Sequence, residues 1–469
     1  MNKITLLLTV VLFTSVTFAQ DKAKKLDSLM TAYHKEKSFN GNVLVAEKGT
    51  IIYQNSFGLA NEKTRQKINL KTVFELASVS KQFTAMGIVQ LQKEGKLQYN
   101  DLISKYLPEL SSYKGVTIKN LLTHTGGLPD YMELLGAEWK SNEIVTNDDV
   151  IKIFEKVKPA ALFSPNEKWE YSNTGYLLLA SIIERVSGKT FTDYLQAKIF
   201  KPLKMNNTFV YRRWYKPEDK TNYASGYIYS DSLQRKVTPD ELGKDYYVVV
   251  LDGIVGDGMV NSNLEDLLKW DRALYGDKLV NKADKELIFS SAATVDGKNT
   301  DYGFGWKINQ NKVYGKIASH SGGWGGYITY IERDLDNDKT IILLQNNDTP
   351  QTRIQYKNIR KILYDLPVYK SITLGSADLK PFEGVYLTES GKENKILLEN
   401  DKLYVEMGSD AYKMELQPVS KSRFVVIGFD PEVTYEFTFG PNGAVEKYRV
   451  QQPEQGVDKT AKKNKVGNN

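Results

Sequence analysis

The chain contains no cysteine and only three histidines among its 469 residues. His34, His124 and His320 are far apart in the sequence, which argues against a metal cage built from histidine and cysteine. The absence of cysteine also excludes a disulfide framework and a lipid-modified N-terminal cysteine. We therefore expect neither a metal nor another cofactor.

The chain also lacks a strong excess of one charge. Its 63 basic and 57 acidic residues give a net charge of +6. Lys3 contributes one of these charges and the segment from Gly456 onward a net three, so only about +2 remains on the rest of the chain. No basic stripe appears along the sequence, and we expect no nucleic-acid partner.

Long apolar runs are absent except at the N-terminus, where one extends from Ile4 to Phe18 after Lys3. Thr17 and Ala19 are small residues at the positions a signal peptidase requires, so residues 1–19 are predicted to be a cleaved signal peptide. A membrane anchor is the alternative, but the run is short of the roughly 20 residues that a span requires. We expect an exported protein, periplasmic or secreted, without a stable membrane anchor.

Hydrophobic periodicity predicts both helices and strands in residues 20–366. A hairpin is predicted from residues 42–46 and 50–53, and a helix that is apolar nearly all round begins near Ser78 and runs to Lys93. Residues 174–187 form a second clear helix, and residues 327–331 and 340–344 have the pattern of strands.

A second unit of only β-structure is predicted for residues 371–455. Val433, Tyr435, Phe437 and Phe439 alternate with polar residues, which is the period-two pattern of a half-buried strand. The size of the unit suits a small sandwich or a lipocalin-like barrel. Residues 456–469 have little apolar content and are predicted to form a disordered tail.

The segment Ser78-Val79-Ser80-Lys81 places a hydroxyl and an amine three residues apart at the start of a buried helix. Residues at this spacing face the same side of a helix. A serine needs a base to become a nucleophile, and a desolvated lysine can be that base. Alone, this short pattern occurs often by chance.

Two further motifs follow. Tyr171-Ser172-Asn173 precedes the helix at 174, where a phenol could shuttle a proton and an amide could hold a substrate; the alternative is a simple helix cap. The glycine-rich segment 320–326 opens a strand, where backbone N–H groups could stabilise an oxyanion; the alternative is a plain turn.

In this order, the three motifs resemble those of the penicillin-recognising serine hydrolases, the family of class C β-lactamases, D,D-peptidases and related esterases. Further segments match this family, and they are 74–84, 118–129, 171–176 and 256–258. The resemblance implies an α+β fold over residues 20–366. In this β-lactamase-like fold an antiparallel sheet is flanked by helices, and an inserted helical region holds Tyr171.

The resemblance also implies roles for single residues. Ser78 would be the acylated nucleophile, and Lys81 and Tyr171 would share the proton transfers, with the base not assigned between them. The oxyanion hole would consist of the backbone N–H groups of Ser78 and Gly323. The substrate-binding residues would be Asn173, His320, Ser321, Gly322 and Trp324, the last as an aromatic wall or as packing at the strand end.

His320 departs from the lysine that many β-lactamases and D,D-peptidases carry at this position. A histidine is mostly neutral at pH 7, so it lacks the permanent cation that faces a substrate carboxylate. The sequence therefore predicts a serine hydrolase acting through an acyl-enzyme on small esters, or on amides and short peptides containing D-amino acids. The alternatives are a β-lactamase or D,D-carboxypeptidase proper, and a non-catalytic binder of cell-wall fragments. Association with the cell wall is compatible with each.

Overall fold

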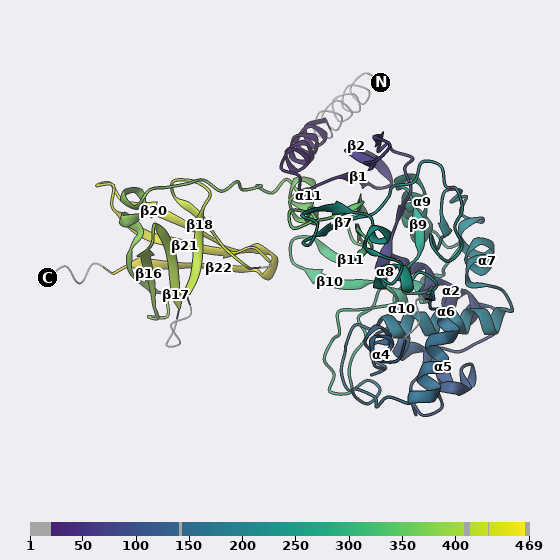
Figure 1. Cartoon of the computed structure of the whole chain (residues 1–469). Helices are drawn as coiled ribbons and strands as arrows, with labels where there is room; N and C mark the ends of the chain where they lie inside the picture. Colours follow the sequence, from purple (N-terminus) through teal and green to yellow (C-terminus); the bar gives the residue numbers. More distant parts are fainter. Residues whose placement is uncertain (1–19, 140–142, 408–412, 430, 465–469) are drawn as a thin grey trace, which may run out of the picture. The chain divides into compact units, whose positions relative to one another are not determined.

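The computed structural model describes residues 20–139, 143–407, 413–429 and 431–464 (Figure 1). The predicted signal peptide, residues 1–19, lies outside the described residues. The chain divides into two units, one formed by residues up to 363 without 310–315, the other by residues 310–315 and 364–469. In the described part of the chain, no helix combines the length and the apolar character that a membrane span requires.

The first unit is built on a six-stranded sheet with the strand order β10-β11-β12-β13-β1-β2. Its strands are β1 (Gly41–Glu47), β2 (Thr50–Phe57), β10 (Lys307–Asn311), β11 (Gly315–Trp324), β12 (Tyr327–Asp334) and β13 (Lys339–Gln345). The predicted hairpin of β1 and β2 is confirmed, and β1 also pairs antiparallel with β13, so that Gly41 lies opposite Gln345. The first strand of the unit thus joins strands made from residues nearly 300 positions later.

Helices pack against this sheet and against one another. They are a helix over residues 20–35, then α2 (Lys81–Lys93), α3 (Ile118–Leu122), α4 (Tyr131–Glu138), α5 (Asn147–Val157), α6 (Asn173–Ser187), α7 (Phe191–Leu195), α8 (Tyr247–Val250), α9 (Leu264–Tyr275), α10 (Lys282–Ile288) and α11 (Tyr356–Leu363). Helices α9 and α11 contact β13, while α2 packs on α6. Gly87 of α2 allows this close packing, because a Cβ there would lie 2.7 Å from the Ile183 side chain.

Short strands complete the unit in three small sheets, β5-β9-β6, β14-β7-β8 and β3-β4. Their bounds are β3 (Leu59–Asn61), β4 (Gln66–Lys67), β5 (Phe74–Glu75), β6 (Phe209–Val210), β7 (Tyr227–Ser230), β8 (Arg235–Val237), β9 (Val260–Ser262) and β14 (Asn347–Asp348). Strand β5 lies immediately before the segment that contains Ser78, so its pairing with β9 fixes where that segment begins.

The second unit is a closed eight-stranded barrel, which confirms the predicted all-β domain. Its elements are α12 (Ser376–Leu379), β15 (Gly384–Thr388), β16 (Glu393–Glu399), β17 (Lys402–Met407), β18 (Lys413–Pro418), β19 (Arg423–Val426), β20 (Thr434–Phe439), β21 (Val445–Gln452) and β22 (Val457–Lys463). Tyr435 and Phe437 face the interior as their alternation predicts.

The predicted disordered tail, residues 456–469, is wrong for half of its length, because Val457–Lys463 form β22. This strand pairs with both β21 and β15 and closes the barrel. Only every second position of such a strand faces the interior, and here the fully buried position is Ala461. The strand is therefore polar in composition although it is part of the barrel wall. Residues 465–469 lie outside the described residues.

Candidate active site

Ser78 lies in a short 3₁₀ turn, Ala77–Ser80, that precedes α2. The predicted start of the α-helix at Ser78 is therefore three residues early, since α2 begins at Lys81. Side chains three residues apart eclipse one another in a 3₁₀ turn. Lys81 Nζ accordingly lies 3.2 Å from Ser78 Oγ, within reach of proton transfer.

Lys81 is completely buried, whereas Ser78 is partly exposed. The Lys81 ammonium also donates to Asn173 Oδ1 at 2.9 Å and to the backbone carbonyl of Asp257 at 2.9 Å. These three contacts use all three N–H donors of a lysine. The Tyr171 ring lies beside them, with its centroid 4.9 Å from Nζ. The structure thus brings Ser78, Lys81, Tyr171 and Asn173 together around one nitrogen.

The residue before the nucleophile has an unusual backbone. Ala77 has a φ of 50°, in the left-handed region that costs a non-glycine residue free energy. Strands β11 and β12 hold this turn in place, because Thr329 Oγ1 donates to the Leu76 carbonyl at 2.7 Å and a Cβ on Gly322 would lie 2.3 Å from the same oxygen. Gly322 is therefore buried against the nucleophile turn.

A cleft opens at Ser78. Four of the predicted site residues line it, namely Ser78, Asn173, Gly323 and Trp324. Its other lining residues are Ala77, Tyr131, Met132, Leu251, Ile254, Asp257, Gly258 and Met259. Gly323 is exposed, and the space where its Cβ would be is open, so a ligand can approach this backbone closely. Ser321 precedes Gly322 on β11 and is half-buried.

His320 is buried and both of its ring nitrogens are engaged. Its Nδ1 lies 2.7 Å from the Ser321 carbonyl oxygen, which can only accept, so Nδ1 carries the proton. Its Nε2 then accepts from the Tyr302 hydroxyl at 2.8 Å. Burial, helped by the nearby Lys81 cation, lowers the pKa of His320 to about 3. His320 is therefore neutral at physiological pH, as expected from the sequence, and its nitrogens point to protein partners.

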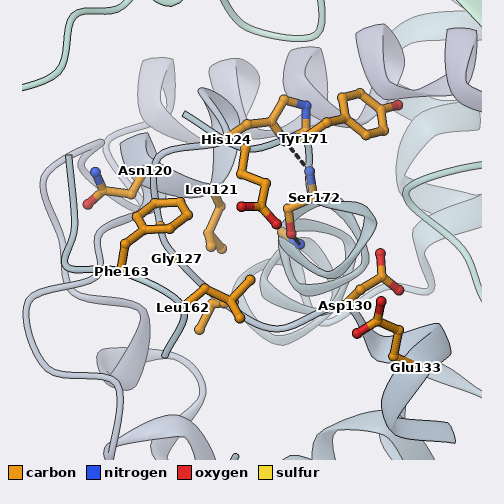
Figure 2. A pocket seen from close by; sticks show the side chains of 14 residues that line it. Asn120, Leu121, His124, Gly127, Asp130, Glu133, Leu162, Phe163, Tyr171 and Ser172 are labelled. Atoms are coloured by element: carbon orange, nitrogen blue, oxygen red, sulfur yellow. Dashed lines mark hydrogen bonds between the residues drawn. The ribbon is translucent and has the colours of Figure 1, made fainter. Parts of the chain in front are cut away.

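His124 holds the loop that carries Tyr171. Its Nδ1 accepts from the Ser172 backbone N–H at 3.1 Å, and its ring centroid lies 4.5 Å from that of Tyr171 (Figure 2). The ring centroid of Tyr302 lies 4.4 Å from that of His124. Burial lowers the pKa of His124 well below its ordinary value. These contacts of His124 are those of a positioning residue.

A recess of about 190 Å³ lies beside this loop. Figure 2 shows its walls, with Phe163 and Leu162 on one side and the side chains of Asp130 and Glu133 converging on the other. Tyr171 contributes to the recess as well as to the surroundings of Lys81. The carboxyl groups make this side of the site acidic.

Three residues of the site were missed at the level of sequence, namely Tyr131, Asp257 and Tyr302. Asp257 holds Lys81 through its carbonyl, and its buried carboxylate accepts from the Tyr131 hydroxyl at 2.9 Å. Its segment matches the family pattern at 256–258, which could have drawn attention to it. Nothing in the sequence around Tyr302 distinguishes it from the other 28 tyrosines.

The fold and the serine paired with a buried lysine define a serine hydrolase. A model of the Beta-lactamase family matches residues 26–365, and the chain belongs to this family.

Relatives cover most of the chain. It is 42% identical over 435 residues to "Penicillin-binding protein 4*" of Bacillus subtilis (strain 168), covering 91% of this chain and 96% of the relative. It is 27% identical over 342 residues to a "Teichoic acid D-alanine hydrolase" of Staphylococcus aureus, covering 72% and 77% of the two chains. Among solved structures, an octameric penicillin-binding protein homologue from Pyrococcus abyssi aligns with a TM-score of 0.64 at 26% identity, over 93% of this chain and 99% of that one.

Proposed function

We propose that this serine hydrolase forms an acyl-enzyme on Ser78 with small esters or amides of D-amino acids and releases the acyl group to water. Ser78 Oγ attacks the substrate carbonyl while its proton passes to the Lys81–Tyr171 pair, one member of which enters this step deprotonated, as the Lys81 amine or as the Tyr171 phenolate. The tetrahedral oxyanion is stabilised by the backbone N–H groups of Ser78 and Gly323, aided by the N-terminal end of α2. The leaving group takes the proton, and water then hydrolyses the ester by the same route in reverse.

The neutral charge of His320 is the observation that supports this class of substrate. A penicillin or a peptide ending in D-alanine presents a carboxylate, which a cation at this strand position would bind. His320 is neutral and its two nitrogens are occupied by Ser321 and Tyr302. The neighbouring recess adds the carboxyl groups of Asp130 and Glu133, which favour a substrate amine over a substrate carboxylate.

The names of the relatives agree with this class of substrate. One of them is a "Teichoic acid D-alanine hydrolase", a name that refers to D-alanine and not to a β-lactam. Other relatives are named as penicillin-binding proteins. The experiment below therefore also tests the β-lactamase and D,D-carboxypeptidase alternatives. The proposal includes export with cleavage after Ala19. The measured mass of the secreted protein would then be that of a chain beginning at Gln20.

A substrate panel tests the reaction. The mature protein would be assayed with a D-alanyl ester, a D-alanyl anilide, its L-enantiomer, a peptide ending in D-Ala-D-Ala and a chromogenic cephalosporin. We expect turnover of the D-alanyl ester and anilide, with loss of all turnover and of fluorophosphonate labelling in Ser78→Ala. Ser112→Ala, at an exposed serine, is the control. Labelling that survives in S78A would contradict the assignment of Ser78 as the nucleophile. No turnover of any substrate would favour a non-catalytic binder of cell-wall fragments.

His320→Lys tests the substrate class. A lysine there would add the missing cation, and one charge-assisted hydrogen bond is worth about 1.5–3 kcal/mol. We expect the acylation rate with the cephalosporin, relative to the D-alanyl anilide, to rise about tenfold or more in H320K and to stay unchanged in the neutral H320Q. A wild-type protein that already turns over the cephalosporin as fast as the anilide would contradict this assignment while leaving Ser78 as nucleophile.

A further inference from the structure

The interior of the barrel is filled with side chains at one end. Phe382 enters from the 3₁₀ turn before β15 and packs against Phe424 and Phe437, with ring centroids 5.0 and 4.7 Å away. Leu379 of α12 joins this cluster. All four side chains are almost completely buried, so this end of the barrel is closed by packed apolar groups.

The other end contains a cavity of about 350 Å³. Its lining is largely apolar and aromatic, and consists of Thr388, Ser390, Lys392, Asn394, Met414, Val426, Phe429, Val433, Tyr435, Tyr448, Val450, Gln452, Val457, Lys459, Thr460 and Ala461. This volume lies at the lower end of the range of about 300–1,000 Å³ for small-molecule sites in proteins. The cavity therefore suits one slender ligand rather than a lipid with two chains.

The register of β21 and β22 shows how the lining changes along the barrel. The pairs Tyr448–Ala461, Val450–Lys459 and Gln452–Val457 follow one another at every second position. Alternate positions share one face of a strand, so these pairs form a ladder on the inner face. The first pair is buried and contributes to the core, while Lys459 and Val457 are more exposed.

The two ends of the cavity differ in chemistry. Deep inside, Asn394 donates to the Tyr448 hydroxyl at 2.7 Å, so these two polar side chains satisfy each other. Lys392 and Lys459 are exposed residues of the lining, and the structure records no carboxylate partner for either among the described residues. Phe429 also lines the cavity and is 43% exposed.

We propose that this barrel cavity binds one single-chain amphiphile, with its alkyl chain inside and its anionic head group between Lys392 and Lys459. Displacing water from the apolar walls supplies the affinity, and the two cations select the head group. A carboxylate of a fatty acid and the phosphate of a lysophospholipid share this chemistry. The site is separate from the hydrolase cleft and independent of its substrate.

The test measures binding to the full mature chain by isothermal titration calorimetry. Dodecanoate and a dodecanoyl lysophosphatidylglycerol are the two anionic probes, and dodecyltrimethylammonium, used below its micelle concentration, is the cationic probe. We expect saturable binding with one site per chain for at least one anionic probe, and weaker binding of the cation. The anionic probe that binds more tightly identifies the source of the head group.

Variants separate this site from unspecific adsorption. Lys392→Glu/Lys459→Glu keeps the cavity and reverses its charge, so it should weaken the anionic probes about tenfold and should not weaken the cationic one. Ala461→Phe fills the cavity from within and should abolish binding of all three. Lys462→Glu changes the outer face of the same strand and is the matched control, with binding like that of the wild type.

Three outcomes would overturn the proposal. They are the absence of saturable binding for both anionic probes, equal loss of affinity in the K392E/K459E and K462E proteins, and unchanged binding in an A461F protein whose near-ultraviolet circular dichroism is that of a folded barrel. Ala461→Val is a milder variant at the same position, because valine fills less of the cavity than phenylalanine. Should A461F fail to fold, A461V must weaken the anionic probes relative to K462E for the proposal to stand.

Discussion

Single residues explain both the chemistry of this site and its departure from the family pattern. Lys81 is held by Asn173 and the Asp257 carbonyl, which orient its nitrogen toward Ser78. His320 occupies a position where many relatives in the family place a cation, yet Ser321 and Tyr302 hold it as a neutral tautomer. The same site thus keeps the paired Ser78 and Lys81 and lacks a cation for a carboxylate at this strand.

The neutral His320 has a consequence for stability. Its pKa is lowered to about 3 in the folded protein, whereas an unfolded histidine titrates near 6.5. Below pH 6.5 the unfolded chain binds a proton that the folded chain does not, so this histidine stabilises the fold above pH 6.5 and the contribution is lost as the pH falls toward 3. We expect it to add up to about 1.4 kcal/mol per pH unit to the slope of unfolding free energy.

Urea unfolding of the wild type and of His320→Gln between pH 7.5 and 4.5 measures this slope. The two proteins should differ by a constant above pH 7, and the H320Q curve should fall less steeply below pH 6. Parallel curves over the whole range would show that His320 becomes protonated in the folded protein as readily as in the unfolded chain. His320 could then be a cation near the substrate, which would contradict the proposed substrate class.

At this scale the sequence motifs located the central residues but not their contacts. Ser78, Lys81, Tyr171 and Asn173 were found because each belongs to a short pattern with a chemical rationale. Tyr302 could not be found in this way. Its importance comes from one hydrogen bond across 18 residues to His320, and such a contact depends on how a loop reaches the strand.

Among the elements, the contact between β11 and the turn that contains Ser78 leaves no room for a side chain. Gly322 touches the backbone of this turn, while Gly323, one residue later, faces open space. Alternation along the strand explains the difference, because neighbouring residues point to opposite faces. One glycine is required by packing and the next leaves room for a ligand.

The pair Gly322→Ala and Gly323→Ala tests this division. A Cβ at Gly322 meets the Leu76 carbonyl at 2.3 Å, so G322A should lose about 1–3 kcal/mol of stability and about a hundredfold in kcat/KM as the turn shifts. G323A should unfold within about 0.5 kcal/mol of the wild type and show its loss in KM. Thermal unfolding and ester kinetics measure both, and equal destabilisation of the two variants would contradict this account.

Elements with a strong period were predictable, whereas their exact beginnings were not. The helix predicted for residues 174–187 is observed as Asn173–Ser187 and ends at Gly188, which has a φ of 69°. The predicted start of the helix at Ser78 is three residues too early. The pairing of β5 and the strained Ala77 impose a 3₁₀ turn there before the α-helix begins. Such a turn is dictated by tertiary contacts and has no periodic signal of its own.

At the scale of the whole molecule, the chain carries two hydrophobic cores. The larger lies in the hydrolase unit and the smaller in the barrel. The division was predictable from the change from mixed to strictly alternating patterns near residue 371. The last strand was not, because five of the seven residues of β22 are polar and only its pairing with β15 and β21 makes it part of the structure.

Truncation tests the role of this strand. A chain ending at Gln455 lacks β22, so β15 and β21 would become free edges and the barrel interior would be exposed. We expect this chain to lose the barrel's unfolding transition and to associate in size-exclusion chromatography. A chain ending at Asn464 should behave like the full-length protein. If the shorter chain keeps its transition and stays monodisperse, β22 is dispensable.

The three residues that accept hydrogen bonds from Lys81 are synthesised at different times. Ser78 lies three residues before Lys81, but Asn173 follows 92 residues later and Asp257 follows 176 residues later. A ribosome has therefore to complete more than half of the chain before the lysine can be oriented, and β13, which joins the first hairpin to the sheet, comes later still. Under the proposed mechanism, a partly made or still unfolded chain cannot activate Ser78, so the enzyme should stay inactive until folding is complete.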